Sequence, residues 1–202
     1  MRITDDRYEE HRRSINLAWR LIQYEARTGT ISRWTQLSDH RIRALYHSYA
    51  VTRHGRIAKR RRGMAPYKLE IIMASPQLRC EAAMFAGICR SVGILSEQEP
   101  PESTPVNDRL QRGELLCEAY DAFCHSLQDA DLTFEQAELV LRELNLGDVV
   151  DLGRCHTCQG VVLIDRLSLA KPECVFCATG VDMPRVASPV SGSPVQPKLP
   201  LS

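Results

Sequence analysis

The chain has 202 residues, of which 44% are apolar and 25% charged, and this ordinary globular composition excludes a collagen-like, a wholly disordered or a purely disulfide-stapled protein. The net charge of +1 conceals an asymmetry, because residues 1–70 carry 16 Lys and Arg against 7 Asp and Glu, whereas residues 71–150 carry 5 against 14. The basic head suggests a polyanionic partner, which the acidic middle would repel.

No stretch of the chain approaches the roughly 18 consecutive apolar residues of a membrane span, and the first residues are charged where a secretion signal would be apolar. We therefore expect a soluble, cytoplasmic protein with no membrane partner. Because thiols stay reduced in the cytosol, the eight cysteines favour metal binding or core packing over disulfides.

The basic head contains two stretches with helical periodicity. The first helix is predicted over residues 14–27, with Gly29 ending it, and its apolar stripe is Ile15, Ala18, Trp19, Ile22 and Ala26. After the connection TISRWTQ, Ser38 is expected to cap a second helix, DHRIRALYHSYA, whose apolar positions are Ile42, Leu45, Tyr46 and Tyr49. The exposed face of that second helix would carry His40, Arg41, Arg43 and His47.

Two helices joined by a short connection have the outline of a helix-turn-helix, whose second helix lies in the major groove of DNA. Arg and His side chains are donors suited to guanine edges and phosphates. Many all-helical domains share this outline without binding DNA. The interpretation of the second helix as a recognition helix therefore depends on the charge around it.

A basic arm, residues 51–64, follows the second helix and has too little periodic apolar content for a regular element. We expect its cations to follow a phosphate backbone or to enter a minor groove. They are Arg53, Arg56, Lys59, Arg60, Arg61 and Arg62. A run of charge is more often a solvated surface, but its position beside a candidate recognition helix favours contact with nucleic acid.

The middle of the chain carries helix-capping patterns. Ser75 and Pro76 predict the start of one helix, Asn107 is expected to cap a long one, and Thr133 with Gln136 forms a capping box for a third, which Gly147 ends. Residues 96–107 are predicted to form a Pro-rich acidic linker. We expect at least five helices in all and no strand before Val149.

Four cysteines near the C-terminal end have the spacing of a zinc site: Cys155, Cys158, Cys174 and Cys177 form two CxxC pairs separated by fifteen residues. Each pair would form a tight turn, or knuckle, and the strand-like run VVLID predicts a small ribbon hairpin that joins the two knuckles. Four thiolates close the coordination sphere, so the ion would be structural. The alternatives are a redox CxxC, unrelated core cysteines, or one iron ion held as in rubredoxins.

The remaining cysteines, Cys80, Cys89, Cys117 and Cys124, lack this spacing and lie on or beside apolar helix faces, so we expect them to pack in the core. His125 and His156 are not expected to be ligands, because four thiolates saturate zinc.

In combination, three segments resemble the flagellar transcriptional regulator FlhC family: ARTGTISRWTQLSDHRIRALYHSY, PQLRCEAAMFAGICRS and the CxxC quartet. The resemblance runs from about Ile15 to Cys177. It implies a mainly helical cytoplasmic protein whose four cysteines bind zinc. It also implies assembly with FlhD in a heterohexamer that activates flagellar operons with RNA polymerase. The chain departs from the family in having Gln159 before Gly160, where glycines commonly follow the first CxxC pair.

The expected fold is mainly α, with a helix-turn-helix-like head and a small four-cysteine, zinc-ribbon-like module. The expected division is a DNA-binding region (1–68), a helical, partner-binding core (69–147), the zinc module (148–182) and a disordered Pro/Ser-rich tail (183–202). We predict an activator subunit that binds double-stranded DNA. The alternative is a zinc-containing adaptor that binds a regulator without reading DNA. The enzyme hypothesis is weakest, because GxxxxGK[ST], HExxH and GxSxG motifs are missing.

Overall fold

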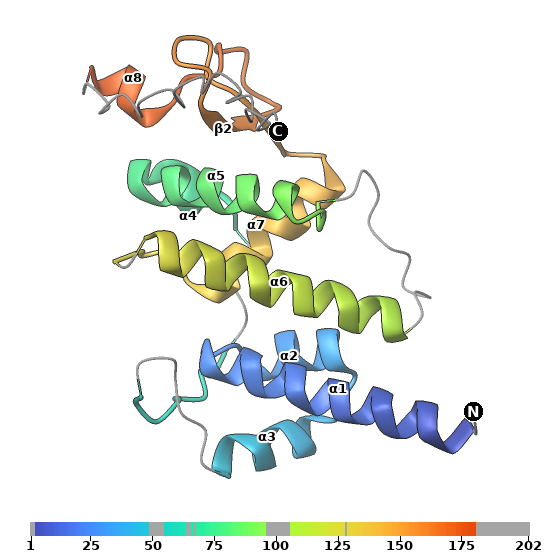
Figure 1. Cartoon of the computed structure of the whole chain (residues 1–202). Helices are drawn as coiled ribbons and strands as arrows, with labels where there is room; N and C mark the ends of the chain where they lie inside the picture. The colour runs from blue at the N-terminus through green and yellow to red at the C-terminus, as the bar shows by residue number, and fades with distance from the viewer. Residues whose placement is uncertain are drawn as a thin grey trace, which may run out of the picture.

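The structure is a computed structural model that describes residues 3–48, 55–63, 66, 68–95, 106–127 and 129–180 (Figure 1). Its helices are α1 (Ile3–Gln23), α2 (Thr28–Thr35), α3 (Asp39–His47), α4 (Glu70–Ala74), α5 (Pro76–Ser91), α6 (Val106–Ser126), α7 (Phe134–Leu146) and α8 (Val175–Thr179), and its strands are β1 (Val150–Arg154) and β2 (Val161–Asp165). The predicted mainly helical fold with a small cysteine module is confirmed. None of the helices in these ranges is both long and apolar enough to cross a membrane.

The elements are stacked along the molecule. Figure 1 shows α1, α2 and α3 at one end, α6 and α5 across the middle, and the hairpin with α8 at the opposite end. One cluster of buried apolar side chains runs through the stack, from Leu17 on α1 through Phe85, Phe123 and Phe134 to Leu163 on β2. The cysteine module thus shares its core with the helices.

The start of α2 corrects the sequence-based description of the head. Helix α1 ends at Gln23, the following Glu25 has a positive φ of 56°, and Gly29 lies inside α2 rather than ending α1. The carboxylate of Glu135 on α7 accepts hydrogen bonds from the Arg27 backbone N–H and the Thr30 hydroxyl. That distant carboxylate satisfies donors at the start of α2, and so stabilises a helix that its Thr, Gly and Ser residues disfavour on their own.

A three-residue turn joins α2 to α3. Gln36 has a φ of 58°, Leu37 is buried, and the Ser38 hydroxyl accepts a hydrogen bond from the Arg41 N–H, so the predicted cap of α3 is confirmed. Ile42 and Tyr46 face the core, and the Tyr46 hydroxyl donates to the Ala26 carbonyl. The helix pair of the helix-turn-helix outline is therefore α2 and α3, with α1 packed behind them.

Most of the predicted capping in the middle of the chain is confirmed. The Ser75 hydroxyl accepts from the Leu78 N–H at the start of α5, Thr133 and Gln136 form the capping box of α7, and Gly147 ends α7 with a φ of 69°. Helix α6 begins at Val106, one residue before the predicted cap Asn107, and α4 was not predicted. Most of the predicted linker, residues 96–105, and the whole of the predicted tail, residues 183–202, lie outside the described residues.

The acidic middle neutralises part of the basic head. Arg13 on α1 forms an ion pair with Glu114 on α6 at 2.7 Å, and Arg20 pairs with Asp121 at 3.0 Å. Arg33 on α2 pairs with Glu138, whose pKa is raised by burial despite that guanidinium. The opposite charges of the two regions thus join α1 and α2 to the rest of the fold.

Gly113 permits the close approach of α6 to α1 and α2. A Cβ atom there would lie 2.7 Å from the Leu17 Cδ2 and 3.3 Å from the Trp34 ring. We expect Gly113→Leu to lower the free energy of unfolding by about 2–3 kcal/mol, because the added side chain has no room. Gly29→Ala is the matched control, since nothing lies within 4 Å of its added Cβ, and it should raise stability by up to about 1 kcal/mol. Urea titration measures both, and a neutral Gly113→Leu would refute this packing.

Candidate metal centre and nucleic-acid interface

The first knuckle lies in the turn of a β-hairpin. Strands β1 and β2 pair antiparallel, from Val150 opposite Asp165 to Arg154 opposite Val161. The turn is closed by the Cys155 N–H, which donates to the Gly160 carbonyl at 2.8 Å, and by Gln159, whose φ is 62°. The predicted strand VVLID is confirmed as β2, but its partner precedes the first knuckle. The hairpin therefore encloses one CxxC pair instead of joining the two.

The second knuckle is the start of α8. The Cys174 sulfur accepts a hydrogen bond from the Cys177 N–H at 3.4 Å and so caps this short helix. The His156 N–H donates to the Pro172 carbonyl at 2.9 Å, which holds the segment before Cys174 against the first knuckle. Local turns position the cysteines within each pair, and this contact brings the two pairs together.

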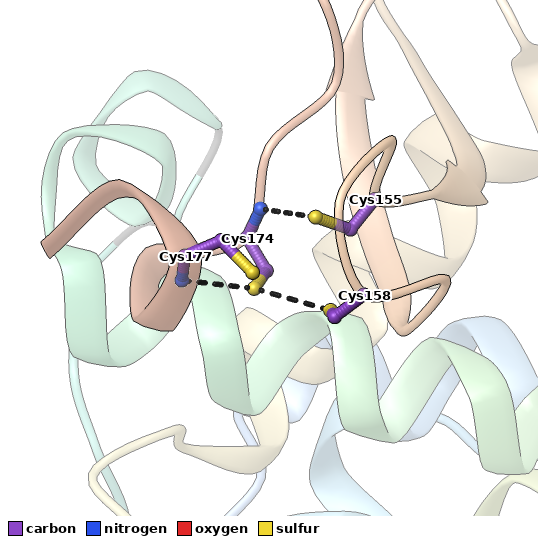
Figure 2. A group of neighbouring side chains, drawn as sticks. All are labelled: Cys155, Cys158, Cys174 and Cys177. Atoms are coloured by element: carbon purple, nitrogen blue, oxygen red, sulfur yellow. Dashed lines mark hydrogen bonds between the residues drawn. The ribbon is translucent and has the colours of Figure 1, made fainter. Parts of the chain in front are cut away.

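The four cysteine sulfurs converge on one point (Figure 2), where all lie within 4.8 Å of one another. The Cys158 and Cys174 sulfurs are 3.6 Å apart, and the Cys174 N–H donates to the Cys155 sulfur at 3.3 Å. Metal–sulfur bonds of about 2.3 Å in a tetrahedron place sulfur atoms about 3.8 Å apart, well beyond the bond length of a disulfide. The cluster therefore has the size and the donor set of a metal site, as the spacing predicted.

Backbone donors favour the thiolate form of Cys155. Its burial raises the pKa, but the N–H groups of Cys158, Cys174 and Thr157 outweigh that effect and lower the pKa to about 6. The hydrogen bond with Cys174 is the main cause that raises the pKa of Cys177, because removing the proton that the two sulfurs share would break that bond. A metal ion must displace such protons to bind all four sulfurs.

The other cysteines and histidines lie outside the quartet. Cys89 and Cys117 are completely buried, and burial raises the pKa of each to about 12, as expected of core thiols. The His156 ring contacts the Pro172 carbonyl at 3.0 Å, and the His125 ring contacts the Asp121 carbonyl at 2.7 Å. Neither belongs to the metal-binding group found among the described residues.

A cavity beside the metal centre was not predicted. It has a volume of about 490 Å³, lies between α5, β2 and α8, and is lined mostly by apolar side chains such as Val161 and Phe176. Cys80 on α5 and the ligand candidates Cys158 and Cys174 share its wall. The sequence could not have predicted this cavity, because it forms only when three distant segments pack together. The position of Cys80 on a helix face was the one related signal.

The predicted recognition helix presents its polar residues to solvent. His40, Arg41, Arg43 and His47 are all exposed on α3, opposite the buried Ile42 and Tyr46. Arg43 forms an ion pair with Asp39 on the same helix at 3.6 Å, and both side chains are more than half exposed. An exposed pair of this kind contributes little stability, so Arg43 can exchange its partner at small cost.

The basic arm lies against the end of α1. Lys59 donates its backbone N–H to Glu25 at 3.3 Å, Arg61 pairs with Glu25 at 3.2 Å, and Arg27 donates to the Arg62 carbonyl at 3.1 Å. Burial raises the pKa of Tyr46 on α3, and the nearby positive charges of Arg60 and Arg61 oppose that rise. The Tyr46 hydroxyl donates to the carbonyl of Ala26, next to Arg27, so the arm and α3 contact the same corner of the fold. Arg56, Lys59, Arg61 and Arg62 are exposed and Arg60 is half-buried, whereas Arg53 lies outside the described residues.

No protein-family model matches the chain, and no curated protein shows significant similarity to it. Its function must therefore be inferred from the two features described above, a four-cysteine centre and a basic surface, which lie at opposite ends of the stack (Figure 1).

Proposed function

We propose that this chain is a DNA-binding subunit of a transcriptional activator, similar in role to FlhC, and that its C-terminal module holds one structural zinc ion. The observation that carries the proposal is the division of positive charge within the basic head. Arg13, Arg20 and Arg33 on α1 and α2 form ion pairs with the acidic helices. The cations on α3 and the basic arm are mostly exposed, and the ion pairs of Arg43 with Asp39 and of Arg61 with Glu25 stay within the basic head. A surface of unbalanced positive charge beside a short exposed helix suits a DNA duplex.

Zinc is the ion that the donor set favours. Four sulfur ligands in a closed tetrahedral arrangement are typical of structural zinc, and one iron ion is the alternative with the same ligands. Because the centre lies at the opposite end from α3, its role in this proposal is to stabilise the hairpin and α8 against α5.

The proposed activator also contains a second protein subunit. The resemblance to FlhC implies an FlhD-like subunit in a hetero-oligomer, flagellar operons as targets, and RNA polymerase as the machinery recruited. Exposed apolar side chains near the metal centre support a partner surface there, because large apolar groups left in water favour contact with another protein. They include Met84, Val161, Leu167 and Leu169. The same observation supports the second candidate function, an adaptor that binds a regulator through the zinc module without reading DNA.

Arg41 offers a test of sequence reading. We expect Arg41→Ala to weaken binding to the preferred duplex by about 1–3 kcal/mol while leaving binding to random duplex nearly unchanged, because a bidentate contact to a base is lost. Competition binding with both duplexes measures the difference. An equal loss on both would show that Arg41 contacts phosphate alone.

The experiment that tests the whole proposal is co-expression with an FlhD-like subunit, followed by metal analysis and footprinting on a flagellar promoter. The proposal predicts a stable complex with one zinc ion per copy of this chain and a protected stretch of DNA. A complex that contains zinc but protects no DNA would favour the adaptor instead.

A further inference from the structure

The basic arm carries an exposed isoleucine between cations. The side chain of Ile57 is 80% exposed, and Arg56 and Lys59 beside it are exposed as well. We propose that Ile57 is an apolar wedge that enters the minor groove of duplex DNA, partly unstacks a base step and bends the duplex. This inference rests on the proposed function and deepens it, because it assigns to the arm a task beyond neutralising phosphates.

The residues around Ile57 are fixed to the body of the protein. Ala58 is only 6% exposed and belongs to the core cluster, and the next residue, Lys59, donates its backbone N–H to Glu25. Arg61 holds the same carboxylate at 3.2 Å. Since Ala58 points inward, the neighbouring Ile57 points outward from an anchored backbone, and a wedge needs such support to displace a stacked base.

The ends of the described arm are turned by glycines. Gly55 and Gly63 have φ values of 72° and 92°, a region that side chains rarely tolerate. Near the second turn, Arg27 at the start of α2 donates to the Arg62 carbonyl at 3.1 Å. The arm is thus attached to the same α1–α2 corner that packs behind α3.

The arm lies close enough to α3 for both to contact the same DNA duplex. The Tyr46 hydroxyl on α3 donates to the Ala26 carbonyl, and the next residue, Arg27, donates to the Arg62 carbonyl at 3.1 Å, so α3 and the arm contact the same corner of the fold. In other DNA-binding proteins, a helix occupies the major groove while an adjoining basic arm enters the neighbouring minor groove. Those proteins that bend DNA insert Phe, Leu, Ile, Met or Pro between base steps, with cations contacting the flanking phosphates.

Another exposed isoleucine in the described chain lacks this setting. Ile71 is 61% exposed, but it lies on α4 directly after Glu70. Ile71 therefore serves as the matched control. It is an isoleucine with a similarly exposed side chain, and it does not belong to the basic arm.

The test uses the full chain with its partner and a duplex of about 30 base pairs, selected from a random pool by the unaltered complex and labelled with a fluorescent dye at each end. Energy transfer between the dyes should rise on binding, as expected for a bend of about 20–90°. Ile57→Ala should lose more than half of that rise while weakening binding by about tenfold or less. Ile57→Met should retain the bend, because it is also apolar, and Ile71→Ala should behave as the unaltered protein.

An Ile57→Ala protein that bends the duplex fully would overturn the wedge, as would an unaltered complex that binds without bending. In either case the proposed DNA-binding function would stand. If the unaltered complex binds no duplex from the pool, the proposed function fails and the wedge fails with it.

Discussion

Cys155→Ser is expected to abolish stoichiometric metal binding and to lower the stability of the whole chain. Cys155 is completely buried, and its sulfur accepts the Cys174 N–H, so a serine there would leave a short polar group in a site built for sulfur. In structural zinc sites, metal binding supplies about 10–16 kcal/mol of folding free energy in isolated modules. Because β1 and β2 share the helical core, we expect a loss of about 3 kcal/mol or more in the free energy of unfolding.

Elemental analysis and thermal unfolding measure the two effects of that change. Cys80→Ser is the matched control, because Cys80 lines the same cavity but stands outside the quartet. It should keep the full metal content. Full metal in Cys155→Ser, or equal metal loss in both variants, would show that the ligand set is not the one assigned.

Changing Arg60, Arg61 and Arg62 together to Ala is expected to weaken binding to every duplex, whatever its sequence. Each lost phosphate contact makes the fall of log affinity with log salt less steep by about 0.9, so three lost contacts weaken binding by about two to three orders of magnitude at 0.1 M salt. The actual loss should be somewhat smaller, because Arg61 already forms an ion pair with Glu25 and must exchange it for phosphate. Fluorescence anisotropy over a salt series measures the slope.

Lys171→Ala provides the control for charge alone. Lys171 is exposed in the loop between β2 and α8, and Figure 1 shows these two elements at the opposite end of the stack from α3. We expect its removal to leave the slope unchanged. If the triple variant keeps the slope of the unaltered protein, the arm does not contact phosphates.

The metal centre could be predicted from sequence because its geometry is local. The two cysteines of a CxxC pair are positioned by one turn, and only the meeting of the two turns requires tertiary structure. The turn chemistry was less predictable, since Gln159 adopts a φ of 62° that favours glycine. Strand β1 was also missed as the partner of β2, because Gly153 weakens its strand pattern. A glycine is needed at position 153 because the Ile164 side chain packs against it. A Cβ atom on residue 153 would lie 2.2 Å from the Cδ1 of Ile164.

Helix α2 could not be predicted for a different reason. Its sequence TGTISRWT contains weak helix formers, and the carboxylate that stabilises its start comes from Glu135, more than a hundred residues along the chain. Long-range contacts of this kind leave no periodic signal. The sequence also could not show which basic residues are neutralised by ion pairs. Arg13 and Arg60 count equally in the composition, and only the fold shows that Arg13 forms an ion pair with Glu114.

In the proposed function, α3 and the basic arm contact DNA while the metal centre stabilises the opposite end of the fold. Site-specific photocrosslinking tests it most directly, with a benzophenone side chain placed at His40 on α3 or at Leu169 beside the second knuckle, both of which are exposed. In the zinc-loaded complex with a labelled duplex, we expect crosslinks to DNA from position 40 and none from position 169. Crosslinks from position 169 alone would contradict it.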